Sequence, residues 1–331
     1  MRPVRPHAHP GPLGLLLPPI SPPALPSAGG TTKGNTTGNT FGTTEWITRL
    51  SREAESAGAG GLWASDHLFW HRPTVECLTT LAVVATATTR VALGTCVLQL
   101  PMRSPAAVAK QSSTLQVLSG GRFILGLGVG VGSHAGEYEA AGADFRHRGR
   151  GLDDGIAAVR RAWDSHGDRL RSYRQEPEGG APVWIGGSST AARRRAATLG
   201  DGWVPLFVSP GDLAGGRATL MDEAAAAGRD PQDLATAVVM VATVGDRTAV
   251  AERDGAAWLS DLYGIPPRAF ARHLVAGPAT RCAERAHEYL AAGAEHVVVM
   301  IAGDHAAESF AAIATAGALV APEPVLTGVG S

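Results

Sequence analysis

Lysine is almost absent from this sequence of 331 residues. All but two of the 29 basic residues are arginines, and the two lysines are Lys33 and Lys110. This bias is typical of a GC-rich genome, so we assign it no function. A formal net charge of −1 also leaves no electrostatic argument for binding nucleic acid or an anionic membrane. We therefore expect neither as a partner.

Cysteine is scarce as well. The sequence has three, Cys77, Cys96 and Cys282, and no two of them form a C-x-x-C pair. This spacing disfavours a disulfide framework and a thiolate metal site, and it is typical of a protein in a reducing cytosol. We predict that the protein binds no metal.

Long apolar runs are lacking too. Near the N-terminus the run 13–17 follows two arginines, but it ends at Pro18 and is too short for the hydrophobic part of a signal peptide. No segment has the roughly 20 apolar residues that a membrane-spanning helix needs. The sequence therefore predicts a soluble, cytoplasmic protein.

Several catalytic motifs are missing. No G-K-[ST], H-E-x-x-H or G-x-S-x-G sequence occurs, which removes the usual support for nucleoside triphosphatase, zinc peptidase and α/β-hydrolase chemistry. The glycine-rich segment 126–132 lacks the G-x-G-x-x-G spacing, and it follows the fourth predicted strand instead of the first. A dinucleotide-binding fold is thus disfavoured.

Apolar residues, in contrast, make up 44% of the sequence, which is enough for a large core. Short apolar runs alternate with longer segments of helical spacing, and several runs are apolar on both faces, as parallel strands covered by helices are. The predicted strands are 13–17, 61–65, 91–98, 122–129, 182–186, 202–205, 236–244 and 296–301. The predicted helices lie near 43–58, 74–88, 104–118, 149–164, 188–200, 211–228, 248–262, 279–292 and 305–317.

Eight strands in alternation with helices predict an α/β fold, a (β/α)8 TIM barrel first and a doubly wound open sheet second. We expect one domain over 1–331, with terminal tails at 1–11 and 318–331. The segment 18–43 is rich in Pro, Gly, Thr and Asn and has no apolar periodicity. We expect it to form a flexible loop after the first strand, on the side where barrel active sites form.

Four polar or glycine-rich clusters follow predicted strands, where a barrel places its active site. The first is Asp66-His67, with Trp70 close behind. A carboxylate beside an imidazole can set the imidazole's tautomer for proton transfer, so His67 and Asp66 are candidate catalytic residues. A structural alternative stays open, in which a buried Asp66 accepts from loop N–H groups while His67 only packs.

The other three clusters are glycine-rich. Gly94 removes side-chain bulk where a planar ligand could approach, although an ordinary strand end explains that segment better. The segment 126–132 could point backbone N–H groups at a ligand, or it could be a flexible loop. Gly186-Gly187-Ser188 precedes a predicted helix and favours a phosphate site at the helix N-terminus, although the serine could act as the N-cap alone.

Taken in order, these clusters and the segments around them match a known pattern. The sequence resembles the luciferase-like monooxygenase superfamily, and within it the oxidoreductases that use flavin or coenzyme F-420, over about residues 12–317. The segments that carry this resemblance are 61–67, 90–95, 105–111, 114–123, 125–130, 182–187 and 199–203.

In that superfamily the barrel holds a flavin or deazaflavin ring over its strand ends. The resemblance implies that Asp66 and His67 lie beside the reactive ring and that Trp70 lines the substrate pocket. It also implies that Thr95 and the Cys96–Val97 peptide bond support the ring, because that bond aligns with a non-proline cis peptide of the deazaflavin members.

The resemblance further assigns cofactor contacts to two glycine clusters. Gly128, Val129 and Gly130 align with a loop that lies along the cofactor, and Gly186, Gly187 and Ser188 align with its phosphate site. Val131, also expected at the substrate pocket, stands where some deazaflavin sugar-phosphate dehydrogenases have an acidic glutamate. The segment 164–181 is shorter than in relatives, which implies a reduced edge at the substrate pocket.

These residues lead to three functional hypotheses. The first is an oxidoreductase that transfers a hydride between coenzyme F-420, a deazaflavin, and a small organic substrate, with His67 moving the proton. The second is a luciferase-like monooxygenase that uses FMN and molecular oxygen. The third is a flavin- or deazaflavin-binding protein without turnover, suggested by the short 164–181 segment. Relatives are often dimers, so a homodimer is also expected.

Overall fold

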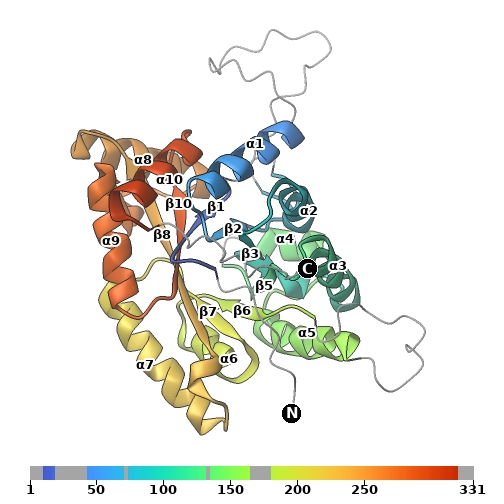
Figure 1. The fold of residues 1–331 in the computed structure, drawn as a ribbon. Helices are drawn as coiled ribbons and strands as arrows, with labels where there is room; N and C mark the ends of the chain where they lie inside the picture. The colour runs from blue at the N-terminus through green and yellow to red at the C-terminus, as the bar shows by residue number, and fades with distance from the viewer. Residues whose placement is uncertain (1–9, 19–42, 71–73, 132–134, 165–179, 320–331) are drawn as a thin grey trace, which may run out of the picture.

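The computed structural model describes residues 10–18, 43–70, 74–131, 135–164 and 180–319. Its centre is a closed ring of parallel strands with helices around the outside (Figure 1). The ring closes because β10 pairs with β1 on one side and with β8 on the other. This closure confirms the predicted α/β TIM barrel and excludes the doubly wound open sheet.

The eight ring strands follow the order β1-β2-β3-β5-β6-β7-β8-β10. Their bounds are β1 Leu13–Leu16, β2 Gly61–Ala64, β3 Ala92–Thr95, β5 Phe123–Gly128, β6 Val183–Gly186, β7 Gly202–Val204, β8 Ala235–Val244 and β10 His296–Ile301. All eight lie within or close to the predicted strand segments. Two further short strands, β4 (Leu98–Gln99) and β9 (Leu274–Gly277), pair with β5 and β8 and were not predicted as separate strands.

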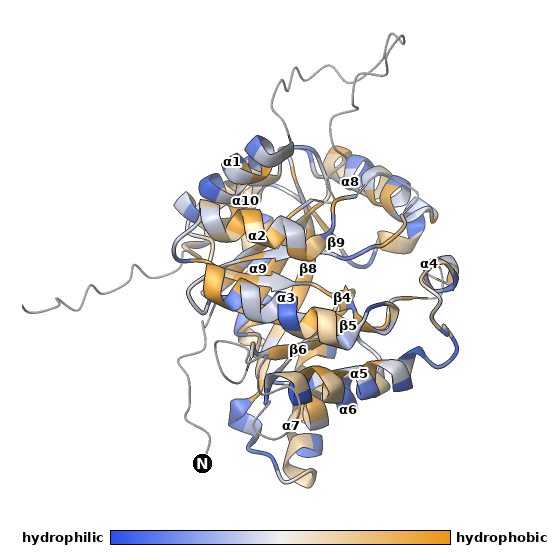
Figure 2. Cartoon of the chain, turned by 90° about the vertical axis from the view of Figure 1, so that its right-hand side faces the viewer, coloured by the Kyte–Doolittle hydropathy of each residue, from blue (hydrophilic) through white to orange (hydrophobic). Residues whose placement is uncertain are grey.

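The strands are buried on both faces. Every residue of β5 and of β10 is buried, which is why these segments are apolar without alternation. Figure 2 shows the hydrophobic residues concentrated on the central strands, while hydrophilic residues lie along the outer surfaces of the helices.

The main helices of the described residues lie close to the predicted segments. They are α1 Thr43–Ser56, α2 Cys77–Ala87, α3 Pro105–Leu118, α5 Arg148–Trp163, α6 Thr190–Leu199, α7 Pro210–Ala226, α8 Thr248–Tyr263, α9 Ala279–Ala291 and α10 Ala306–Gly317. A short helix, α4 (Ala135–Ala140), follows β5. Local caps explain several starts: the Ser104 side chain caps α3 with Pro105 at its first position, and Ser189 caps α6.

The barrel interior contains two stacked indoles. The rings of Trp63 on β2 and Trp184 on β6 have centroids 5.1 Å apart. A Cβ added to Gly94 would lie 2.2 Å from the Trp63 ring, so Gly94 is needed for this packing. Its absent side chain therefore makes room for Trp63, and the interpretation of Gly94 as an approach for a planar ligand was wrong.

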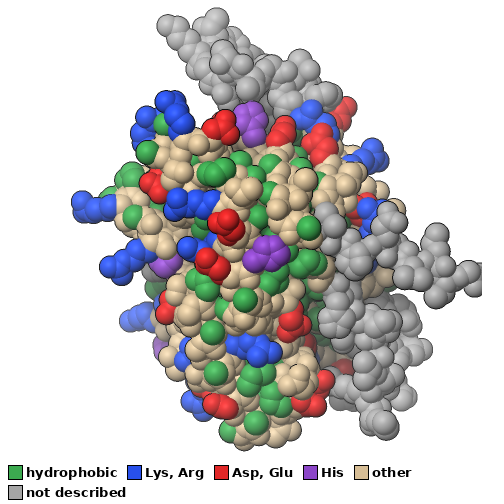
Figure 3. All heavy atoms as spheres, turned by 60° about the vertical axis from the view of Figure 1, so that its left-hand side comes forward, with side chains coloured by type: hydrophobic (Ala, Val, Ile, Leu, Met, Phe, Trp, Pro, Cys, Tyr) green, Lys and Arg blue, Asp and Glu red, His purple; other side chains and the backbone are tan. Residues whose placement is uncertain are grey.

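The outer surface carries charges of both signs. On the face in Figure 3, basic and acidic side chains are intermingled, in keeping with the small net charge of the whole sequence. Within the described ranges, none of the helices combines the length and apolar character needed to cross a bilayer. The expected loop at 18–43 and both predicted tails fall mainly outside the described residues, so their predictions stay untested.

Candidate functional site

The four clusters expected to converge do so at the carboxyl ends of neighbouring strands. The N–H of Cys96 donates to the carbonyl of Ala64, which joins the end of β2 to the end of β3. The buried Thr95 hydroxyl donates to the Gly126 carbonyl at 2.6 Å, which joins β3 to β5. β5 in turn pairs with β6, which ends at Gly186. One end of the barrel therefore holds all four segments.

Val97 lies between the glycines of this end. A Cβ on Gly128 would lie 2.5 Å from one methyl group of Val97, and a Cβ on Gly186 would lie 2.7 Å from the other. The Cys96–Val97 peptide bond is cis, as the resemblance implied. These glycines are thus required by the approach of the Val97 side chain, a reason that the sequence alone did not reveal.

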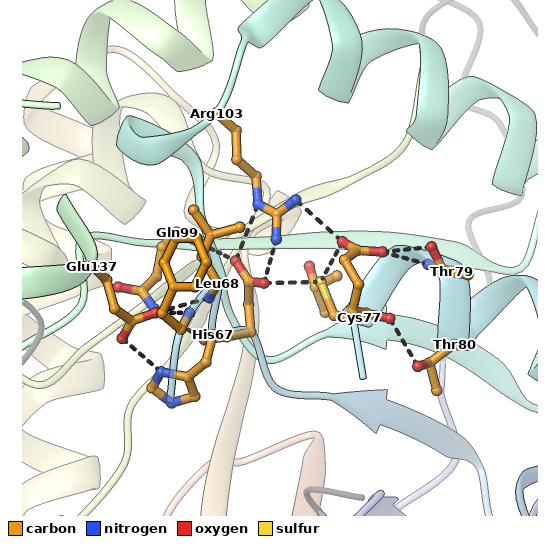
Figure 4. Close-up of polar contacts among 12 residues, drawn as sticks. His67, Leu68, Cys77, Thr79, Thr80, Gln99, Arg103 and Glu137 are labelled. Atoms are coloured by element: carbon orange, nitrogen blue, oxygen red, sulfur yellow. Dashed lines mark hydrogen bonds and ion pairs between the residues drawn. The ribbon is translucent and has the colours of Figure 1, made fainter. Parts of the chain in front are cut away.

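The Asp66 carboxylate forms part of a buried polar network. Its carboxylate accepts from the backbone N–H of Gln99 at 2.9 Å, and it forms an ion pair with Arg103 at 2.5 Å (Figure 4). The expectation that Asp66 holds His67 was wrong, because its carboxylate is directed at Gln99 and Arg103. The structural alternative is met in part: the buried Asp66 accepts from one backbone N–H, that of Gln99 on β4, and its other contacts are with side chains.

Asp66, Glu76 and Cys77 form an acidic group with the spacing of a metal site. The positive charge that balances these carboxylates comes from Arg103, because its guanidinium pairs with Asp66 and also with Glu76 at 3.2 Å. Burial raises the pKa of the Cys77 thiol well above its usual value, and the charges of Asp66 and Glu76 add to the shift. A protonated thiol and an arginine at the centre of the group favour an ion-pair network over a metal site.

His67 is held by a different carboxylate. Its Nδ1 lies 3.0 Å from Oε1 of Glu137, a buried side chain on α4 (Figure 4). The other carboxylate oxygen accepts from the backbone N–H groups of Leu68 at 2.8 Å and Phe69 at 3.1 Å. The imidazole ring also packs against Trp70, with centroids 3.8 Å apart and the two ring planes tilted by 34°. His67 is therefore fixed by one carboxylate and one aromatic face.

An aromatic group continues from Trp70 across the same end of the barrel. Tyr263, at the end of α8, meets Trp70 edge-on with centroids 6.3 Å apart, and it also contacts Phe207 and Phe270. Burial raises the pKa of Tyr263 to about 12, so its phenol stays protonated at neutral pH. Sequence analysis singled out Trp70 but not Tyr263, Phe207 or Phe270, because these three come from separate parts of the chain.

Two of the groups predicted to bind a phosphate already have hydrogen-bond partners within the protein. The N–H of Gly187 donates to the Val204 carbonyl at 3.3 Å, so it is not free for a ligand as the glycine pair suggested. The Ser188 hydroxyl donates to the Leu206 carbonyl at 2.6 Å. Ser188 also lines a hollow between α6 and α7 together with Arg193, whose buried Nε has no hydrogen-bond partner among the described residues.

The remaining predicted residues flank this end of the barrel. Val129 and Gly130 directly follow β5, and the Val129 carbonyl accepts from the Tyr138 hydroxyl at 2.9 Å. Val131 is 59% exposed on the surface beside them. Most of the short 164–181 segment lies outside the described residues. The predicted contacts of these residues with a cofactor or substrate stay predictions.

Sequence analysis did not single out Glu137, Arg103 or Arg193. Seventy positions separate Glu137 from His67, and no spacing rule connects residues that far apart. Only the position of Glu137 soon after a glycine-rich strand end, where barrels collect functional side chains, could have drawn attention to it.

Comparison with known proteins finds similar sequences and folds. A family model described as luciferase-like monooxygenase matches residues 25–316. A phthiodiolone/phenolphthiodiolone dimycocerosates ketoreductase of Mycobacterium kansasii is 29% identical over 276 residues, which are 70% of this chain and 73% of that protein. An uncharacterised protein of Mycobacterium tuberculosis is 36% identical over 151 residues, 43% of this chain, and the match spans about half of that protein, 51%.

Two solved structures show the same fold at low sequence identity. An F-420-dependent secondary alcohol dehydrogenase in complex with an F-420-acetone adduct superposes with a TM-score of 0.73 at 18% identity, over 83% of this chain and 95% of that one. The oxygenating constituent of 3,6-diketocamphane monooxygenase from Pseudomonas putida, in complex with FMN, gives a TM-score of 0.68 at 17% identity, over 94% and 98%.

Proposed function

The chain belongs to the luciferase-like monooxygenase family, and on that premise we propose that it is an oxidoreductase that binds coenzyme F-420 and exchanges a hydride with a small organic carbonyl compound or alcohol. The observation that carries the proposal is His67, an imidazole fixed by Glu137 and Trp70 at the barrel end where this fold performs its chemistry. Hydride transfer to a carbonyl carbon needs a proton for the oxygen, and an oriented imidazole is suited to supply it.

The phosphate group common to F-420 and FMN fits the residues present. The buried Nε of Arg193 has no partner among the described residues, and it belongs to α6, whose first turn offers backbone N–H groups and the positive end of the helix dipole. Asp212, which lines the same hollow, has its carboxylate bonded to Ser209. We propose that Arg193 and the start of α6 hold the phosphate.

When bound, the cofactor would supply the hydride, and the protein's own residues would orient and protonate the substrate. Trp70 and Tyr263 would form an apolar wall beside His67 that excludes water from the reacting atoms. The ketoreductase relative and the F-420-dependent alcohol dehydrogenase both support carbonyl–alcohol chemistry for this chain. The three free thiols support a location in the reducing cytoplasm.

FMN is the second candidate cofactor. The fold that this chain shares with the FMN-bound monooxygenase supports it as an alternative to F-420. We would titrate the apoprotein with F-420 and with FMN and follow ring absorbance and fluorescence. We would then add ketones to the reduced complex and record cofactor oxidation and oxygen uptake. F-420 binding with ketone-dependent oxidation is expected. Binding of FMN alone, with oxygen consumed on turnover, would instead establish the monooxygenase.

A further inference from the structure

We propose that Glu137 is the positioning residue that fixes which nitrogen of His67 exchanges a proton with the substrate. The inference rests on the proposed function, in which His67 moves that proton. Glu137 would hold the Nδ1 proton, so that Nε2 is the reactive nitrogen.

Both oxygens of the Glu137 carboxylate have hydrogen-bond partners. One oxygen lies 3.0 Å from Nδ1 of His67, and the other accepts from two backbone N–H groups, those of Leu68 and Phe69. An ionised carboxylate only accepts hydrogen bonds, so Nδ1 must be the donor. In the neutral imidazole the proton is then on Nδ1, and Nε2 carries the lone pair.

The carboxylate is itself held in place by its helix. Next to it on α4, the buried Tyr138 donates its hydroxyl to the Val129 carbonyl at 2.9 Å, and its ring packs edge-on against Phe145. Two consecutive residues of α4 thus join the loop after β2 to the loop after β5. Because Glu137 is only 6% exposed, water competes little for its oxygens.

The proton balance follows from this tautomer. In the direction of carbonyl reduction, the substrate carbon receives the hydride and the substrate oxygen receives the Nε2 proton of a charged His67, which is left neutral. In the reverse direction, the Nε2 lone pair takes the hydroxyl proton. The Glu137 carboxylate stabilises the charged imidazolium and keeps the ring from turning, as a carboxylate does beside a catalytic histidine.

The Glu137→Gln variant tests the tautomer directly. If the carbonyl oxygen of the new side chain still accepts from the backbone N–H groups of Leu68 and Phe69, its NH2 group must face Nδ1 of His67. Nδ1 then has to accept a hydrogen bond. The proton would move to Nε2. We would record ¹⁵N NMR spectra of histidine-labelled apoprotein at alkaline pH, and identify the His67 signals by their loss in His67→Gln.

The wild type should show the Nδ1–H tautomer and Glu137→Gln the Nε2–H tautomer, while the exposed Glu139→Gln should match the wild type. An Nε2–H tautomer in the wild type would overturn the proposal. This measurement does not depend on whether a Glu137 variant folds. An unchanged tautomer in a folded Glu137→Gln protein would also overturn it.

Turnover separates this inference from the proposed function. In the F-420 enzyme, Glu137→Gln should lower kcat about tenfold or more with KM little changed, as loss of a histidine-orienting carboxylate does. The tautomer switch without any F-420 turnover would retain the positioning of His67 and remove the proposed reaction. Full turnover in Glu137→Gln, despite the switch, would remove the positioning role.

Discussion

The indole of Trp63 donates a hydrogen bond of 2.9 Å to Nε2 of His296 inside the barrel, at the end opposite the candidate site. The Nδ1 of His296 lies 2.5 Å from the Gly11 carbonyl, which can only accept. His296 is therefore neutral, with one nitrogen accepting and the other donating. Burial lowers its pKa from 6.5 to about 4.

This neutral histidine should make stability depend on pH. The unfolded chain takes up the proton near pH 6.5, whereas the folded protein resists it down to about pH 4. The free energy of unfolding should thus fall as the pH drops through this window, by up to about 3 kcal/mol. Urea denaturation across that range, compared with His296→Gln and the exposed His305→Gln, would measure it. An equal slope in His296→Gln would contradict the prediction.

The ion pair of Asp66 and Arg103 should respond asymmetrically to mutation. Arg103→Met leaves a buried carboxylate without its cation and should cost about 3–5 kcal/mol of unfolding free energy. Asp66→Asn keeps an oxygen for the Gln99 N–H and should cost less. The double variant should lose less than the sum of the two. Additive losses in chemical denaturation would show that the pair is not coupled.

The Val97 side chain should determine whether a larger residue is tolerated at the neighbouring glycines. Gly186→Ala would place a methyl group against the Val97 side chain and should destabilise the protein by about 1–3 kcal/mol. Val97→Ala in the same chain should recover part of that loss. Gly215→Ala, in a helix with open space around the new Cβ, is the matched control and should not destabilise. Thermal melts would compare the four proteins.

Arg193 should bind the phosphate group of the cofactor and should not contact its ring. Arg193→Met should weaken binding of the phosphorylated cofactor about 10- to 100-fold, the loss expected for one hydrogen bond to a charged group. Binding of an analogue without the phosphate should hardly change. Arg194→Met, an exposed neighbour on the same helix, is the control. Equal weakening for both ligands in a fluorescence titration would place Arg193 elsewhere in the site.

His67→Ala should lower the turnover number but leave the affinity for the cofactor almost unchanged. Loss of a general acid should lower turnover about 10²- to 10⁴-fold, while cofactor affinity, measured by fluorescence titration, should change little. His273→Ala is a useful comparison, because that imidazole packs against Phe207 in the same aromatic region. Wild-type turnover in His67→Ala would remove its role as proton donor.

Local sequence patterns were enough to predict the alternation of strands and helices and the end of the barrel at which the candidate site lies. Parallel strands buried on both faces leave a continuous apolar signal, and helix caps such as Ser104-Pro105 are local. β4 was not predicted as a separate strand because the predicted strand 91–98 runs through Cys96 and Val97, which separate β4 from β3. β9 lies between α8 and α9, in a segment that was predicted as neither strand nor helix.

Which side chains meet at that end became clear from the three-dimensional structure alone. Sequence adjacency suggested Asp66 as the partner of His67, but the two side chains contact different parts of the protein. Asp66 reaches Arg103, and His67 meets Glu137 from a helix seventy positions away. Pairing over such distances depends on how loops are brought together by the closed barrel, and no local pattern of residues encodes it.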